Sequence, residues 1–257
     1  MIRFVSAFCL ILLTLGVSSA SAEEMDAQSI LEKSKVALDS TLEGSRKIVV
    51  EIKNKNGSTT EWVARQAQKT FPDGKRSLMV LMKPDSIKGT AYLIWKPNDT
   101  RGMVQWVYVP AMRRIREIKY QDIYGSFLNT DYTFADLDIN YIQATHKLLE
   151  KSLFKEKMVF KIESIPDPNY YYSKIISYID CESYLPLHRE FYDMVGRLWK
   201  KKLFEAFVVV DNAPVAIGVM MKDLNSGTST RFVYSEICHD VKALTLKDFE
   251  PMSLSHA

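Results

Sequence analysis

The chain has 257 residues, and its 34 lysines and arginines against 31 acidic residues give a formal charge of +3. Apolar residues make up 47% and charged residues 25% of the chain. A chain of this composition buries enough apolar surface to offset its ordering entropy, which excludes intrinsic disorder. The balanced charge also argues against a nucleic-acid-binding protein, because such proteins carry a basic stripe.

The first 22 residues have the pattern of a secretory signal peptide. Arg3 gives a positive start, an apolar stretch runs from Val5 to Val17, and small residues lead up to cleavage after Ala22. The apolar stretch is too short to span a bilayer. We therefore expect an exported protein whose mature chain, residues 23–257, forms a single domain.

Hydrophobic periodicity divides the mature chain into one helix and many strands. Apolar residues between Asp26 and Leu42 fall mostly at helical spacing, which predicts an amphipathic helix. Runs rich in Val, Ile, Tyr, Phe and Trp, separated by turn residues, predict about 10–11 strands. These runs cover 47–53, 61–70, 75–82, 90–95, 103–109, 157–165, 171–179, 186–192, 198–210, 215–224 and 230–237. Short loops between consecutive runs favour an antiparallel meander.

Residues 110–156 interrupt this pattern. They contain a basic segment, a Gly-Ser-aromatic loop, an acidic-aromatic stretch and an amphipathic run over 139–154, which predict an insert of loop and short helices. Several of the strands before the insert are apolar at consecutive positions, so both of their faces are apolar. A large curved sheet with an apolar concave surface accounts for this with few helices.

Motifs typical of enzymes are missing from the sequence. It contains no G-x-S-x-G elbow, P-loop, H-E-x-x-H, C-x-x-C or G-x-G-x-x-G after a strand. Asp136-x-Asp138-x-Asn140 resembles the start of a calcium loop, but Tyr141 stands where such a loop needs glycine. Solvated carboxylates at a helix start are the better interpretation. We expect no enzyme activity, no cofactor and no metal.

Two cysteines, Cys181 and Cys238, lie in the mature chain. In an oxidising compartment they either pair as a disulfide or stay as two separate thiols. The sequence leaves both alternatives open, because it does not show the distance between their Cα atoms.

A basic cluster of Arg113, Arg114 and Arg116 follows the apolar strand that ends near Pro110. One interpretation is a contact with anionic lipid head groups or an acidic partner, where each charge contributes on the order of 1 kcal/mol. The other is a charged strand edge that discourages aggregation.

Three motifs resemble the bacterial outer-membrane lipoprotein-sorting-like family, which is related to the periplasmic carriers LolA and LolB. They read G-T-x-x-L at 89–93, W-x-Y-x-P-A-x-R-R-I-R at 106–116 and G-S-F-x-x-x-D-x-x-x-x-D-L at 125–137. Segments 184–193 and 221–228 also look like that family. The resemblance thus covers about residues 26–250.

The resemblance implies an α+β, mainly β fold. This LolA-like fold is an incomplete antiparallel β-barrel, with the N-terminal helix and the insert as a lid over its concave face and an apolar cavity inside. It further implies a monomeric periplasmic protein that carries a lipid or an acylated protein, with an RND- or MMPL-type inner-membrane exporter as partner. The alternative is a non-catalytic docking subunit of an envelope transport complex that carries no lipid of its own.

For a carrier, apolar residues of the middle strands and the insert are the expected cavity lining. The residues we predict there are Leu81, Leu93, Trp95, Trp106, Tyr108, Phe127 and Phe134. Arg113, Arg114 and Arg116 are the predicted contact for a head group or a partner. A one-residue change in strand register exchanges the two faces of a strand, so the strand members of this set depend on the register.

Overall fold

A computed structural model describes residues 26–39, 43–99, 102–137 and 142–256. The predicted signal peptide, residues 1–22, lies outside the described residues. No helix in the described part of the chain is long and apolar enough to cross a membrane.

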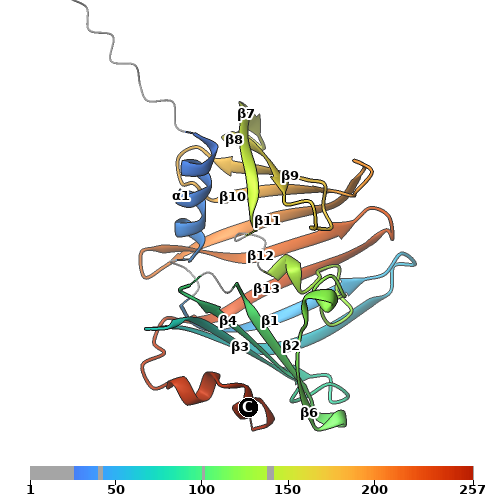
Figure 1. The fold of residues 1–257 in the computed structure, drawn as a ribbon, viewed down its shortest axis with the longest axis vertical. Helices are drawn as coiled ribbons and strands as arrows, with labels where there is room; N and C mark the ends of the chain where they lie inside the picture. The colour runs from blue at the N-terminus through green and yellow to red at the C-terminus, as the bar shows by residue number, and fades with distance from the viewer. Residues whose placement is uncertain (1–25, 40–42, 100–101, 138–141, 257) are drawn as a thin grey trace, which may run out of the picture.

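One antiparallel sheet of 13 strands makes up most of the described chain (Figure 1). Its first six strands are β1 (Gly44–Lys53), β2 (Thr59–Phe71), β3 (Gly74–Lys83), β4 (Ala91–Pro97), β5 (Val104–Val109) and β6 (Arg114–Glu117). The other seven are β7 (Ala144–Phe154), β8 (Lys157–Pro166), β9 (Lys174–Asp180), β10 (Pro186–Tyr192), β11 (Leu198–Val210), β12 (Ala213–Asp223) and β13 (Thr228–Cys238).

The sheet consists of two meanders, β1–β6 and β7–β13. Pairing of β1 with β13 joins them, with Val49 opposite Val233, and the full order is β6-β5-β4-β3-β2-β1-β13-β12-β11-β10-β9-β8-β7. The end strands β6 and β7 do not pair with each other, so the sheet stays open. This is the incomplete antiparallel barrel that the sequence predicts.

Two strands were not predicted, which raises the number from about eleven to 13. The short strand β6 contains Arg114 and Arg116 of the basic cluster, and Arg113 directly precedes it. The prediction of a helical run over 139–154 is wrong, because residues 144–154 form β7. In that strand Ala144, His146 and Leu148 are half-buried and the residues between them are exposed, which is the period of a strand. Residues 138–141 lie outside the described part.

The predicted N-terminal helix is α1 (Ala27–Asp39), and it lies across the concave face of the β7–β13 meander (Figure 1). Asp26 caps it, since its carboxylate accepts the Ser29 backbone N–H at 2.7 Å. Ile30 is fully buried against Ile162 and Ile179. One end of the apolar stripe thus covers β8 and β9, and the other end, at Leu38, packs on Phe204 of β11 and Val219 of β12.

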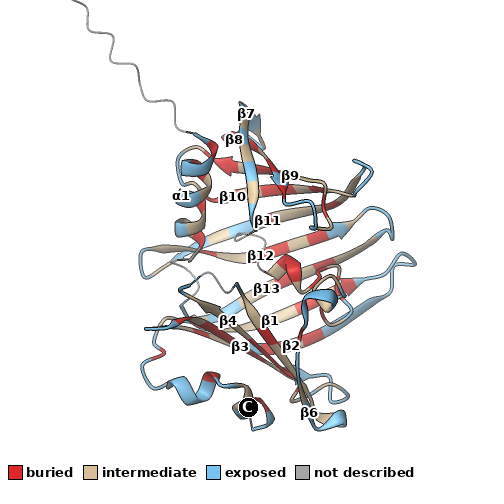
Figure 2. Cartoon of the chain, in the orientation of Figure 1, coloured by how far each residue is buried: buried red, intermediate tan, exposed pale blue. Residues whose placement is uncertain are grey.

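Residues 118–137 of the insert, which we call the lid, lie on the concave face next to β1, β2, β4 and β13. Phe127 and Tyr132 are buried in the main hydrophobic cluster with Ile48, Trp62 and Phe232. Figure 2 shows this buried stretch beside the sheet. The lid chain turns back at Leu128 and Asn129, which have φ values of 49° and 60°.

The C-terminal segment covers the outer face of the β1–β6 meander. It contains two short 3-10 helices, η4 (Leu246–Phe249) and η5 (Pro251–Ser255), whose Phe249 and Leu254 are buried against Leu93. Strands β3 to β5 therefore have apolar side chains on both faces: one face meets the lid and the interior, and the other meets this segment. Cys181 and Cys238 are both free thiols.

Candidate functional site

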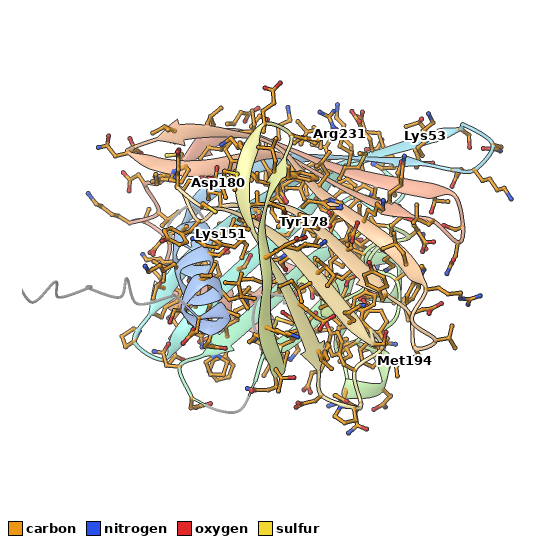
Figure 3. The ribbon with its side chains drawn as sticks, turned by 90° about the horizontal axis from the view of Figure 1, so that it is seen from above. Lys53, Lys151, Tyr178, Asp180, Met194 and Arg231 are labelled. Carbon is orange, nitrogen blue, oxygen red and sulfur yellow. The ribbon has the colours of Figure 1, made fainter. Side chains whose placement is uncertain are left out.

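The concave face holds a cavity of about 210 Å³, which we call the inner cavity. It lies between the sheet, the C-terminal end of α1 and the lid, and Figure 3 shows side chains filling this side of the curved sheet. Most of its wall is apolar, with Ile48, Met79, Ile94, Phe127, Val219 and Phe232 among the lining residues. An engineered apolar cavity of about 150 Å³ binds benzene, so the inner cavity has room for part of an apolar chain.

Cationic and amide groups also line the inner cavity. Arg46 donates a hydrogen bond from Nε to Oε1 of Gln66 at 2.7 Å, and its guanidinium lies 4.4 Å from the ring centre of Tyr234. Burial lowers the pKa of Arg46. Lys202 enters the same cavity from β11, and burial lowers its pKa to about 7.

A second cavity, of about 390 Å³, lies between α1 and strands β7 to β10, and we call it the helix-side cavity. Its lining is mainly polar and includes Ser34 of α1 and Arg189 of β10. His146 and Ser164 also line it and satisfy each other through a 2.8 Å hydrogen bond between Nδ1 and Oγ. The two cavities adjoin each other, because Arg189 stands directly opposite Lys202 in the β10–β11 register.

Asp136 anchors the lid over the inner cavity. Its Oδ2 lies 3.3 Å from Nζ of Lys200 on β11, and both side chains are at most 3% exposed. Its Oδ1 accepts hydrogen bonds from the hydroxyls of Tyr171 and Tyr172 at 2.6 and 2.9 Å, and the Thr133 backbone N–H donates to Oδ2 at 2.8 Å. Burial, and then the charge of Asp136, raises the pKa of both tyrosines well above its usual value, so they stay protonated donors.

The prediction of solvated carboxylates at this position is wrong for Asp136, which is 2% exposed and paired. Its partner Lys200 was not predicted, because lysines are almost always exposed, whereas this one is 2% exposed. Asp138 and Asn140 lie outside the described residues. No three His, Cys, Asp or Glu side chains cluster in a metal-binding arrangement within the described part of the chain.

Asp131 provides a second lid anchor, on β13. Its Oδ2 accepts a hydrogen bond from the hydroxyl of Thr230 at 2.6 Å, and its Oδ1 accepts one from Thr228. The Thr230 hydroxyl in turn accepts the Asp131 backbone N–H at 2.9 Å. The two aspartates of the motif at 125–137 therefore hold the lid on the sheet, from β11 and the 170–172 loop on one side and from β13 on the other.

The seven predicted lining residues separate into two groups. Phe127 lines the inner cavity, while Leu81 and Phe134 belong to the hydrophobic cluster around it. The other four, Leu93, Trp95, Trp106 and Tyr108, lie on the outer face. There Leu93, Trp106 and Tyr108 pack with the C-terminal segment, and Trp95 stacks on Arg76 at 4.8 Å. On β4, the register brings Tyr92 and Ile94, the neighbours of Leu93, to the cavity instead.

The basic cluster lies at the edge of the sheet, away from both cavities. Arg113 follows a short 3-10 helix (Pro110–Met112) and has a φ of 47°. Arg114 and Arg116 are exposed on the edge strand β6. Arg116 pairs with Asp122 at 3.1 Å. Contact of this cluster with a head group or a partner stays a prediction, with the charged strand edge as its alternative.

Solved structures of other proteins share this fold. A putative outer membrane lipoprotein-sorting protein domain from Vibrio parahaemolyticus is 25% identical, with a TM-score of 0.80 over 89% of this chain and 98% of that one. A DUF1329 family protein from Desulfovibrio piger is 22% identical, with a TM-score of 0.79 over the same shares. A LolA superfamily protein from Nitrosomonas europaea is 20% identical, with a TM-score of 0.69 over 88% and 98%. These similarities confirm the predicted LolA-like fold.

A family model described as "uncharacterized protein" matches residues 73–256, more than two thirds of the chain. The chain therefore belongs to that family, DUF1329. Among curated proteins, none matches the sequence significantly.

Proposed function

We propose that this protein is a periplasmic carrier that binds a lipid, or the acyl chains of a lipoprotein, in the inner cavity and moves it across the envelope. The observation that carries the proposal is the apolar cavity of about 210 Å³ between the concave face, α1 and the lid. The similarity to a putative lipoprotein-sorting domain of the same fold supports it. An inner-membrane exporter of the RND or MMPL type is the partner that we propose for cargo transfer.

The energetics of the cavity suit a reversible carrier. Each methylene group that leaves water contributes about 0.8 kcal/mol, so a long acyl chain gains on the order of 10 kcal/mol. Loss of ligand freedom and ordering of the site offset much of that gain. The chain is then held during transfer and still released to an acceptor.

The proposal needs no chemical step on the cargo. The groups that line the inner cavity are mainly aliphatic and aromatic. Its buried carboxylate, Asp136, is engaged in four contacts, three of which join the lid to β11 and the 170–172 loop. We therefore propose a binding role rather than an enzymatic one.

Native mass spectrometry with solvent extraction tests this function on protein purified from the periplasm without detergent. We expect a discrete added mass that extracts as a lipid or as an acylated peptide. A clean unliganded mass, together with no uptake when membrane lipids are offered, would contradict the carrier and favour the docking subunit.

A further inference from the structure

Two cations, the buried Arg189 and the half-buried Lys202, face each other between the two cavities. Arg189 on β10 and Lys202 on β11 are direct cross-strand partners, and their side chains share the concave face. Side chains opposite each other in an antiparallel pair have Cβ atoms about 5 Å apart. Arg189 is only 5% exposed. The β-sheet thus holds two like charges side by side on its concave face, an arrangement that is destabilising by itself.

Neither cation has an anionic partner among the described residues. Nε of Arg189 is buried without a hydrogen-bond acceptor, and its guanidinium lies over the ring of Phe204, at 5.9 Å. Nζ of Lys202 lies over the rings of Tyr132 and Phe204, at 5.3 and 5.4 Å. The hydroxyls of Ser34, in the helix-side cavity, and of Tyr132, in the inner cavity, are also buried without a partner.

The acidic groups near this pair are engaged elsewhere. Asp136 lines the inner cavity, but Lys200, Tyr171, Tyr172 and Thr133 hold its carboxylate. Glu32 of α1 lines the helix-side cavity and accepts a hydrogen bond from Gln28 at 3.2 Å. A buried arginine without a counter-ion costs several kcal/mol, and a bound ion is one of the features that account for such an unsatisfied group in a native protein.

We propose that Arg189 and Lys202 bind the anionic group, a phosphate or a carboxylate, of an amphiphilic ligand whose apolar chain lies in the inner cavity. This rests on the proposed function and adds the chemical class of the cargo. The arrangement suits it, since Lys202 lines the apolar cavity and Arg189 the polar one, so one ligand meets both. The planar guanidinium can bind two oxygens of one anion at once.

The lowered pKa values of both groups agree with an anion site between them. Burial, and then the charge of Arg189, lowers the pKa of Lys202 to about 7. Burial lowers the pKa of Arg189 to about 10. A bound anion would offset the cost that these shifts express, because an opposite charge stabilises the protonated forms.

The test compares twelve-carbon probes that differ in their head groups. Isothermal titration calorimetry below pH 7 measures binding of dodecyl phosphate, dodecanoate, neutral dodecyl maltoside and inorganic phosphate alone to the delipidated protein. We expect the two anionic amphiphiles to bind roughly 10- to 100-fold more tightly than the maltoside, the range for hydrogen bonds to charged groups. Inorganic phosphate, without a chain, should bind far more weakly than dodecyl phosphate.

The double variant R189M/K202M should lose the preference for anionic head groups and keep binding of the maltoside. The matched control is K201M, whose lysine is the neighbour of Lys202 on β11, stands opposite Glu190 and lines neither cavity. Melting temperatures separate binding from a structural role. Removal of these two charges, which have no counter-ion among the described residues, should leave the melting temperature unchanged or higher, whereas removal of a structural contact would lower it.

Three results would overturn the inference, and they differ from failure of the carrier function. Equal binding of anionic and neutral amphiphiles to the unmodified protein would leave the carrier intact without an anion site. An unchanged preference in the double variant would place the anion elsewhere. Inorganic phosphate that binds as tightly as dodecyl phosphate would show an anion site without an amphiphile. No binding of any amphiphile contradicts the carrier itself.

Discussion

Buried charge is the main feature of this protein at the scale of residues. Asp136 and Lys200 form a paired, hydrogen-bonded site, whereas Arg189 and Lys202 face each other with no counter-ion in the described part of the chain. The first arrangement holds the lid in place, and the second is costly in the unliganded protein. The two pairs therefore have opposite expected effects on stability.

Loss of one partner of the paired site should destabilise the protein strongly. Lys200→Met leaves the buried carboxylate of Asp136 without its cation, which costs about 3–5 kcal/mol. Urea unfolding measures the loss, with Lys201→Met as control, which should change stability by about 0.5 kcal/mol or less. A loss below about 1 kcal/mol for Lys200→Met would show that the pair does not hold the lid.

Lys202 should make stability depend on pH. Its pKa is about 7 in the folded protein and about 10.4 when unfolded. Between these values the unfolded state binds more protons, so the free energy of unfolding rises with pH from about 7 upward. The charged groups that surround it are Arg189 on β10, Asp136 on the lid and Arg46 across the cavity.

Unfolding at several pH values between about 6 and 9 checks this expectation. The difference in stability between Lys202→Met and the unmodified protein should favour the variant below pH 7 and shrink as the pH rises. A difference that is constant over this range would mean that Lys202 keeps an ordinary pKa.

At the scale of elements, the lid is the feature that depends on specific contacts. Thr230 is fully buried on β13 and exchanges hydrogen bonds with the backbone and carboxylate of Asp131. Thr230→Val removes these bonds and leaves a carboxylate oxygen unsatisfied, which costs about 1–3 kcal/mol. Hydrogen exchange should accelerate in residues 125–137 and stay unchanged in β8 to β10. With Ser229→Val as control, equal exchange of the lid in both variants would contradict the anchor.

The C-terminal segment should contribute to the stability of the β1–β6 meander. Phe249 is 1% exposed and packs on the ring of Phe71 at 5.5 Å. Phe249→Ala should cost about 3–5 kcal/mol in urea unfolding, as for other buried aromatic side chains. Met252→Ala, at a side chain that is 76% exposed, is the control. Similar values for both variants would mean that the segment does not cover the sheet.

Most elements were predictable from the sequence because their patterns are local. The stripe of α1 has a clear period of 3.6, and the strands on both sides of the insert are rich in Val, Ile, Tyr, Phe and Trp between turn residues. Strand β7 was missed because its half-buried and exposed residues both include charged or polar side chains, which hides the alternation. The direction of each strand face was not predictable: Leu93 and Tyr92 are both large side chains that proteins bury, and only long-range pairing decides which one points inward.

The cations of the site were unpredictable for a different reason. Lysines and arginines are almost always exposed, so a sequence pattern assigns Lys200, Lys202 and Arg189 to the surface. Their same-face positions on β10 and β11 become visible only when the register is known. The two aspartates of the lid motif stood out in the sequence through the resemblance to a family. The residues that they contact did not.

At the scale of the whole molecule, the two meanders form one curved sheet with different covers on its two faces. The helix α1 and the lid close the concave face over the cavities, and the C-terminal segment closes the outer face of the first meander (Figure 1). The exposed basic cluster on β6 lies at the edge, outside both covers. We therefore propose that the cargo binds in the interior between the sheet, the helix and the lid.

Filling the inner cavity tests that claim most directly. Ala216 on β12 lines the cavity, whereas Ala206 on β11 is exposed, so Ala216→Phe and Ala206→Phe make the same change inside and outside. The measurement is the dissociation constant of a fluorescent fatty-acid probe for both variants and the unmodified protein, with melting temperatures alongside. If Ala216→Phe displaces two methylene groups of the probe, its affinity falls by roughly tenfold, while Ala206→Phe leaves it unchanged. Equal affinity of all three proteins would contradict the carrier account, because the probe would then bind outside the inner cavity.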